Sequence, residues 1–248
     1  MLMISEISKK LKKLWKPVWT KEKERFFMEK KKIRKLFKII LIVALITLAI
    51  VVIHTIRNFI IITDLQNKIS EYSNSTNYYT KSVANENNGI IITMKYYKKD
   101  NKQAVFLERN LNGEITKMSM YNNGERTDLF IEATDSKIAQ LNSGTMMSVD
   151  IYNQLETENS WQTFLGSIFS SVKSTKYNGK DCYAISNFMS SNSLSYDKQT
   201  VYIDKDTGLS VKNEIDKIVT EREYEFNNVE DSIFVEPDIS QYTLKENN

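Results

Sequence analysis

The sequence predicts a mainly β (α+β) fold, in which a large, twisted antiparallel sheet is covered by a helix and preceded by a single transmembrane helix. An apolar block fills residues 36–56, β-rich runs at hairpin spacing begin at Ile90, and one helical stripe interrupts them near Leu165. The domains expected from these features are a basic cytoplasmic segment (1–35), a transmembrane helix (36–56), a stalk and linker (57–77) and an extracellular β domain (78–248).

Residues 36–56 form the predicted membrane span. Their only charge is Lys38 at the edge, and at about 1.5 Å rise per residue the run is about 31 Å long, enough to cross a bilayer. A buried core helix and a cleaved signal peptide are the alternatives. We favour a retained helix because a long basic segment precedes the block and no small-residue cleavage site follows it.

Charge is segregated around this block. The whole chain has 248 residues and a formal charge of only +3, but residues 1–38 hold 14 Lys and Arg against 4 Asp and Glu. Residues 39–56 hold no charge, and residues 57–248 hold 20 basic against 27 acidic side chains. Positive flanks stay on the cytoplasmic side. We therefore expect a plasma-membrane protein with a cytoplasmic N-terminus and an extracellular C-terminal domain.

The first 18 residues have the pattern of a basic amphipathic helix, with apolar positions every three or four residues. Pro17 is expected to end or bend this helix. Because cationic amphipathic helices bind anionic lipid surfaces, we predict membrane-surface contacts for Lys9, Lys10, Lys12, Lys13 and Trp15. Nucleic-acid binding is the alternative, but no recognisable nucleic-acid-binding fold fits into 38 residues.

Beyond the span, helical spacing continues as a short stalk toward Tyr72. An Asn- and Ser-rich stretch then reads as linker as far as Gly89. Four runs joined by tight turns follow and predict an antiparallel meander: 90–99, 103–110, 114–121 and 126–133. Later candidate strands are 145–152, 181–188, 199–204, 209–216 and 218–227.

A helix is predicted over residues 161–172, where one apolar stripe combines Trp161, Leu165, Ile168 and Val172 with two phenylalanines. We expect this helix to cover the sheet. Methionine adapts to varied apolar partners, so a Met- and Phe-lined face suits acyl chains or apolar peptides. The candidate ligand-binding residues are Met94, Phe106, Met118, Met120, Phe130, Phe164, Ile168 and Met189. Ordinary core packing is the alternative for each of them.

Catalytic chemistry has little support in the sequence. The only histidine, His54, lies at the external end of the span, so histidine-based triads and zinc sites are excluded from the external domain. No phosphate-binding loop or nucleophile elbow occurs, and Cys182 reads as a small buried residue. Asp204 to Gly208 reads as a turn, because it lacks the later ligands of a calcium loop. We predict no enzyme activity, no metal and no cofactor.

The order of elements resembles a known family. Strand-turn-strand units carrying NNGER and LFIEA, a covering helix, the run TVYIDKDTGL and the ending FNNVEDSIFVEPDISQY together resemble the LolA/LolB-like lipoprotein-carrier fold, which the sensor domain of RseB shares. The resemblance covers residues 78–244. It implies an incomplete antiparallel barrel whose concave apolar side, plugged by helices, binds acyl chains. Membrane anchoring departs from that family, because a lipoprotein shuttle must diffuse.

Three functions follow from these patterns. The first is a membrane-anchored extracytoplasmic domain that binds a lipid, a lipoprotein or another apolar ligand. The second is an envelope protein-protein interaction or stress-sensing module without a small ligand. The third is an external hydrolase built on paired carboxylates, for which no pair stands out. The expected partners are the lipid bilayer and a lipid, lipoprotein or envelope protein, and no nucleic acid.

Overall fold

The computed structural model describes residues 2–86, 89–144, 160–186 and 199–245, and for residues 2–29 and 73 it describes the backbone alone. The predicted strand 145–152 and the predicted ligand-binding residue Met189 lie outside these ranges, as do the side chains of the predicted membrane-surface residues Lys9, Lys10, Lys12, Lys13 and Trp15. The chain divides into two compact units, Met1–His54 and Thr55–Asn248.

Helix α1 (Leu2–Ser73) contains the apolar block. Large apolar side chains from Leu36 to Ile53 are exposed along it, and its most apolar window has a mean hydropathy of 3.1. Within the described residues it is the one helix long and apolar enough to cross a membrane. The sequence predicts that the helix ends or bends at Pro17. It does not end there, because α1 continues through Pro17. A proline removes one helical hydrogen bond, and the neighbouring residues keep their own hydrogen bonds.

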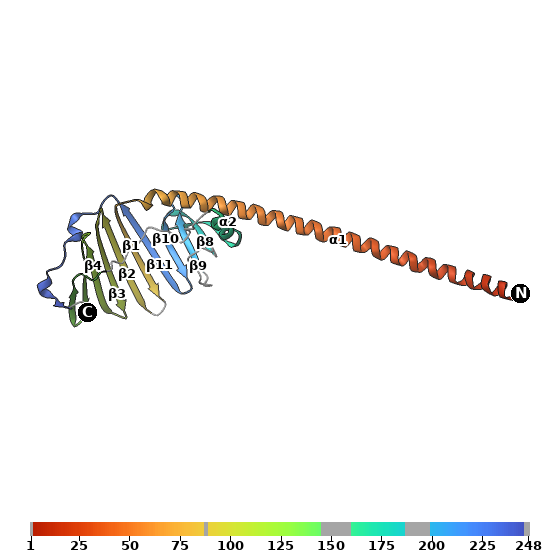
Figure 1. Cartoon of the computed structure of the whole chain (residues 1–248), viewed down its shortest axis with the longest axis horizontal. Coiled ribbons are helices and arrows are strands. Elements are labelled where there is room, and N and C mark those ends of the chain that lie inside the picture. Colours follow the sequence, from red (N-terminus) through yellow and green to blue (C-terminus); the bar gives the residue numbers. More distant parts are fainter. Residues whose placement is uncertain (1, 87–88, 145–159, 187–198, 246–248) are drawn as a thin grey trace. The chain divides into compact units, whose positions relative to one another are not determined.

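The second unit is built on one open, curved sheet (Figure 1). Its strand order is β12-β6-β5-β4-β3-β2-β1-β11-β10-β9-β8-β7, and every pairing is antiparallel except that of β12 with β6. The strands are β1 (Asn77–Glu86), β2 (Ile90–Lys99), β3 (Lys102–Leu111), β4 (Glu114–Asn122), β5 (Thr127–Ala133), β6 (Ser136–Gln140), β7 (Ser171–Tyr177), β8 (Lys180–Ser186), β9 (Gln199–Asp204), β10 (Ser210–Ile215), β11 (Ile218–Phe226) and β12 (Thr243–Leu244).

The predicted meander is confirmed in β2 to β5, which pair in chain order. The turns lie where the sequence places them. Asp100 and Asn112 have positive φ angles of 53° and 52°, and Gly113 follows at 98°. Asn, Asp and Gly tolerate this left-handed conformation, which tight hairpins require.

The predicted linker after Tyr72 is wrong over most of its length. Residues Asn77–Glu86 form β1, which pairs with β2 on one side and with β11 on the other. Tyr78 lies opposite Phe226, which comes much later in the chain. The polar composition of β1 hid a strand that pairs along its length with both β2 and β11, and the pairing with β11 joins residues far apart in the chain.

The segment expected to be a stalk packs on one face of the sheet, which we call the helix face. Ile62 and Leu65 of α1 are fully buried among four residues of β7 to β9: Val172, Ile185, Val201 and Ile203. Further along α1, Ile69 and Tyr72 pack with a second buried group on this face. The sheet therefore buries α1 from about Thr55 onward as part of its own core.

Helix α2 (Ser160–Phe169) packs on α1. The side of α2 that is buried is not the apolar stripe that the sequence analysis expects to be buried. Its buried residues are the small Thr163, Gly166 and Ser167, whereas Trp161, Leu165 and Phe169 are 65, 44 and 68% exposed. Val172, expected in the helix, lies in β7. Small side chains let the two helices approach closely, and buried hydrogen bonds between them favour this face over the apolar one.

The other face of the sheet, here the strap face, carries the C-terminal strap, residues 227–245, which includes the short helices η1 (Asp231–Phe234) and η2 (Ile239–Gln241). Ion pairs hold the strap: Asp231 binds Lys99 at 2.8 Å and Lys102 at 3.3 Å, and Glu236 binds Arg126 at 3.2 Å. The strap ends in β12, which adds a parallel strand beside β6.

Candidate functional site

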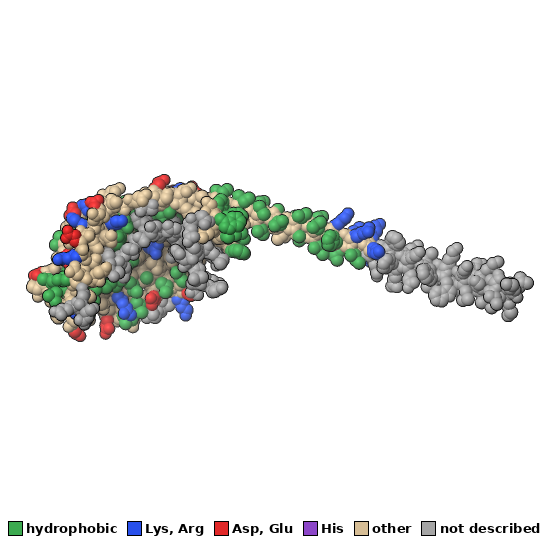
Figure 2. All heavy atoms as spheres, viewed as in Figure 1, with side chains coloured by type: hydrophobic (Ala, Val, Ile, Leu, Met, Phe, Trp, Pro, Cys, Tyr) green, Lys and Arg blue, Asp and Glu red, His purple; other side chains and the backbone are tan. Residues whose placement is uncertain are grey.

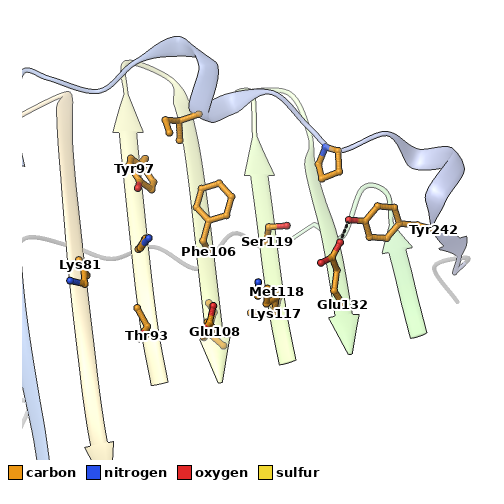
Figure 3. Close-up of a pocket in the computed structure, with 14 residues that line it drawn as sticks. Lys81, Thr93, Tyr97, Phe106, Glu108, Lys117, Met118, Ser119, Glu132 and Tyr242 are labelled. Atoms are coloured by element: carbon orange, nitrogen blue, oxygen red, sulfur yellow. Dashed lines mark hydrogen bonds between the residues drawn. The ribbon is translucent and has the colours of Figure 1, made fainter. Parts of the chain in front are cut away.

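The candidate site is a groove of about 630 Å³ on the strap face, between the strands and the strap (Figure 3). This volume lies in the range of about 300–1,000 Å³ that is usual for small-ligand sites. Strands β1 to β5 form its floor and the strap forms one wall. We call it the β1–β5 groove, and its lining is Lys81, Thr93, Lys95, Tyr97, Phe106, Leu107, Glu108, Lys117, Met118, Ser119, Glu132, Ile233, Pro237 and Tyr242.

An aromatic ladder runs along the strap side of this groove. Ring centroids of successive members are 4.7 to 5.7 Å apart, and four of the five contacts are edge-to-face. Such pairs contribute about 0.5–1.5 kcal/mol each beyond the burial of their area. The ladder crosses the sheet from β1 to the strap through Tyr79, Tyr97, Phe106, Tyr121, Phe130 and Tyr242. Its members Tyr97, Phe106 and Tyr242 give the groove an apolar wall.

Two lysines face each other across the floor of the groove. Lys81 of β1 lies directly opposite Lys95 of β2. Lys81 also binds Glu223 of β11 at 3.2 Å, whereas Lys95 is exposed and its other register partner is the apolar Phe106. Like charges directly opposite each other destabilise a sheet. Lys81 and Lys95 lie beside an aromatic wall, and an anionic group bound between them would stabilise this arrangement.

A second row across the groove alternates in charge. Register places Glu108 opposite Lys117, Lys117 opposite Glu132, and Glu132 opposite Lys137. The pKa of Glu132 is lowered first by the hydrogen bond that Tyr242 donates and then by that of Lys137. Burial and the same hydrogen bond raise the pKa of Tyr242 to about 12. This row is electrically balanced and Glu223 pairs with Lys81, so the positive charge of the groove that these pairs leave over lies at Lys95.

The sheet divides the predicted ligand-binding residues between its two faces. Met94, Met118 and Met120 belong to the helix-face group with Ile69 of α1, although Met118 also contributes to the groove. Phe106 and the buried Phe130 belong to the strap face. Phe164 and Ile168 lie on α2 and are partly buried. The ring centroid of Phe164 is 6.0 Å from that of Phe59 of α1. The predicted set does not form one site.

The register of the hairpins is the sequence signal that assigns the predicted ligand-binding residues to one face of the sheet or the other. A two-residue turn at Asn112–Gly113 pairs Leu111 with Glu114, and counting back from it places Phe106 opposite Ser119 instead of beside Met118 or Met120. Neighbouring residues on a strand point to opposite faces. Applied strand by strand, this count brings Lys95, Phe106, Ser119 and Phe130 onto one rung, and it leads to the lysines that composition alone did not single out.

Metal binding has no visible centre in the part of the chain that the structure describes. Across residues 2–86, 89–144, 160–186 and 199–245, no three His, Cys, Asp or Glu side chains gather as a metal site would require. Asp204 instead accepts backbone hydrogen bonds from Asp206 and Thr207 within the β9–β10 turn, as the sequence predicts.

No protein-family model matches the chain, and no curated protein matches it. Solved structures do match, and they include the MucA/MucB complex of Pseudomonas aeruginosa, with 12% identity and a TM-score of 0.33. That match covers 69% of this chain and 60% of the other, so this chain spans about three fifths of the length of that protein.

Two further structures match over nearly their whole length. A conserved protein from Thermus thermophilus is 9% identical with a TM-score of 0.41, covering 74% of this chain and 98% of that one. A domain described as an outer membrane lipoprotein-sorting protein, from Vibrio parahaemolyticus, is 13% identical with a TM-score of 0.31, covering 70% and 95%. The open, curved sheet with helices on one face is the LolA/LolB-like arrangement that the sequence resemblance implies.

Proposed function

We propose that the chain is a membrane-anchored extracytoplasmic binding domain, without catalytic activity, for an amphipathic ligand that carries an anionic group. One observation carries this proposal: the facing pair Lys81 and Lys95 adjoins the aromatic wall of the β1–β5 groove. An apolar chain would lie against Tyr97, Phe106 and the strap, and its charged head would pair with the lysines. A lipid with an anionic head group has this chemistry.

Charge and hydropathy along the chain support the location. The exposed apolar stretch of α1 follows the strongly basic segment, and the net-acidic β domain comes after it. On this basis the N-terminus is cytoplasmic and residues 57–248 are extracellular. Protease added to intact cells should digest the β domain and leave the basic N-terminus protected. Digestion of the N-terminus alone would reverse this orientation.

Photolabelling tests the ligand directly. The full chain, reconstituted in phosphatidylcholine nanodiscs, is exposed to a lysophosphatidylglycerol that carries a diazirine in its acyl chain. Labels should map to the groove strands or to the strap, near Tyr97, Phe106 or Pro237. Lys95→Glu should reduce labelling by about tenfold. This corresponds to a loss of about 1.4 kcal/mol in binding free energy, a size that one charge reversal in a partly enclosed site can produce.

Two controls make this test specific. Lys176→Glu reverses an exposed charge on β7, near the opposite edge of the sheet, and should leave labelling unchanged. A neutral head group, lysophosphatidylcholine with the same diazirine, should label the groove less than the anionic lipid. Equal labelling by both lipids, or by the wild-type and Lys95→Glu chains, would remove the support for anionic recognition.

Partner binding is the second candidate, because the alternating row Glu108, Lys117 and Glu132 offers donors and acceptors suited to a peptide. A photoreactive benzoylphenylalanine placed at Ser119, in the floor of the groove, distinguishes the two in living cells. A protein adduct of defined mass would favour the envelope interaction module. Lipid adducts without a protein adduct would favour ligand binding.

A further inference from the structure

Helix α2 exposes its large apolar side chains and buries its small ones. Phe169 and Trp161 are more than 60% exposed, and Leu165 is 44% exposed. These residues are spaced at four, so they share one side of the helix. Figure 2 shows hydrophobic side chains gathered over α2. Exposing these large apolar side chains to water alone is unfavourable.

The contacts of α2 fix where along α1 this apolar side lies. Asn58 of α1 is fully buried and donates from Nδ2 to the backbone carbonyl oxygens of Ser170, at 2.9 Å, and Ser167, at 3.3 Å. At the other end of α2, Thr163 donates its hydroxyl hydrogen to Gln66 Oε1 at 3.3 Å. Helix α2 therefore runs antiparallel to α1, and its carboxyl end lies beside Asn58.

Asn58 follows the predicted span almost immediately. Ile56 is the last residue of the span, and two residues of helix advance the chain by about 3 Å. Gln66 is ten residues beyond Ile56, or about 15 Å along the helix. The carboxyl end of α2, with Phe169, therefore lies beside the first residues that follow the predicted span, and Leu165 and Trp161 follow toward the level of Gln66. On α1 itself, Ile60 is still 61% exposed at this level.

Cations accompany the apolar residues. Arg57 is exposed and donates from Nη1 to the carbonyl oxygen of Val172 at 3.3 Å, which places it at the junction of α2 and β7. Lys173 is the next residue and is also exposed. Aromatic side chains and long cations are the residues that proteins place at the boundary between hydrocarbon and head groups.

We infer that α2 docks on the outer surface of the lipid bilayer, with Phe169 inserted most deeply, Leu165 above it and Trp161 at the head groups. The inference rests on the membrane anchoring proposed above. It gives α2 a role beyond packing on α1: together with the Asn58 contacts, the helix fixes how the binding domain stands on the membrane. It also explains why the apolar side of α2 faces away from the protein.

Tryptophan fluorescence can test this order of depths. The chain contains three tryptophans, so Trp15→Phe with Trp19→Phe leaves Trp161 as the sole reporter. Adding Trp161→Phe and Phe169→Trp moves the reporter to the end of the helix that is closer to the span. Both chains are reconstituted in vesicles of phosphatidylglycerol and phosphatidylethanolamine, and quenching by lipids brominated near the head group is compared with quenching by aqueous iodide.

The inference predicts a graded result. Because interfacial helices bury their apolar side about 5–10 Å into the boundary region, the reporter at position 169 should lose at least about half of its fluorescence to brominated lipid. The reporter at 161 should lose less to lipid and more to iodide. A control reporter, Asp135→Trp in a chain without the other tryptophans, lies in the β5–β6 turn near the far edge of the sheet and should respond to iodide alone.

Two outcomes would overturn the inference, and they are distinguishable. Flotation of the same samples reports the anchoring: a chain that fails to float with the vesicles contradicts both the anchoring and the docking of α2. A chain that floats while positions 161 and 169 are quenched by iodide as fully as position 135 contradicts the docking of α2 alone. In that case the apolar side of α2 would be a surface for a protein partner.

Discussion

Tyr242 donates its hydroxyl hydrogen to Glu132 across 2.5 Å, and this bond ties the C-terminal strap to β5. The same tyrosine closes the aromatic ladder, with its ring centroid 5.2 Å from that of Phe130. Lys137 lies 5.5 Å from the Tyr242 ring and 3.2 Å from the Glu132 carboxylate. The three side chains therefore fix one wall of the β1–β5 groove.

Removing this hydroxyl group should raise the pKa of Glu132. The pKa is lowered first by the Tyr242 hydrogen bond, so Tyr242→Phe should move it back toward the ordinary value of 4.5. A carboxyl whose pKa is lower in the folded chain adds stability above its unfolded value, and the contribution is lost as pH falls through the folded value. The variant should therefore lose part of its stability at neutral pH and depend less on pH in the acidic range.

Two measurements check this. Carboxyl chemical shifts during an NMR titration give the pKa of Glu132, and urea unfolding at neutral pH should show a loss of about 1 kcal/mol for a partly exposed hydrogen bond to a charged group. Tyr183→Phe, on β8, is the matched control and should leave the Glu132 pKa unchanged. An unchanged pKa in Tyr242→Phe would contradict the assigned cause.

Asn58 should matter more for stability than its position in α1 suggests. Asn58→Ala removes the Nδ2 donor of a fully buried side chain and leaves the Ser167 and Ser170 carbonyl oxygens with one partner fewer. We expect a loss of about 1–3 kcal/mol in the free energy of unfolding. Asn67→Ala is the matched control at an exposed position of the same helix, and urea unfolding of the full chain in detergent should show little change for it.

Gly208 should tolerate no side chain. It has φ +73°, and a Cβ built there would lie 2.5 Å from the carbonyl oxygen of Leu65 and 3.0 Å from the backbone nitrogen of Ile69. Both atoms belong to the backbone of α1 and cannot move aside cheaply. Gly208→Ala should cost more than about 2 kcal/mol, from overpacking and left-handed strain together.

Gly179 provides the comparison for this position. It also has a positive φ, +81°, but a Cβ there would meet nothing within 4 Å. Gly179→Asn should therefore cost only the small strain that asparagine shows in this conformation. Thermal unfolding of the two variants measures the difference, and equal losses would show that the contact with α1 contributes nothing.

Cys182 should be unreactive in the folded chain. It is fully buried on β8, and burial raises the pKa of its thiol, which keeps the thiolate fraction small near neutral pH. Since it is the one cysteine of the sequence, iodoacetamide labelling followed by mass spectrometry should report its exposure. We expect slow modification in buffer and rapid modification in urea. Rapid modification without denaturant would mean that the β8 region opens readily.

Local pattern predicted much of the fold. The turns at Asp100 and Asn112 and the strands around them follow from residue type and alternation, and the structure confirms them. Local pattern failed where an element is stabilised by distant residues. β1 was expected to be linker because its polar residues carry no strong signal, and one of its two partner strands, β11, lies far along the chain. The strap, likewise, meets the sheet through long-range contacts, which are the packing of Ile233, Phe234 and Tyr242 and surface ion pairs such as Asp231 with Lys99.

The candidate site was less predictable, because it depends on which face each side chain takes. Met120 and Phe106 both suited an apolar cavity, yet they lie on opposite faces of adjacent strands. A change of one residue in register reverses every face assignment. Apolar composition could therefore supply the residues for a binding surface but could not say which of them meet.

The sequence by itself determined the apolar block, the charge asymmetry around it and the turns of the meander, because each depends on neighbours within a few residues. The tertiary structure decided three things: the central place of β1, the inverted packing of α2 on Asn58, and the meeting of Lys81 and Lys95 beside the strap. Each of these joins residues far apart in the chain or fixes the register between strands. Their energies exist only once the sheet has formed, so no local pattern contains them.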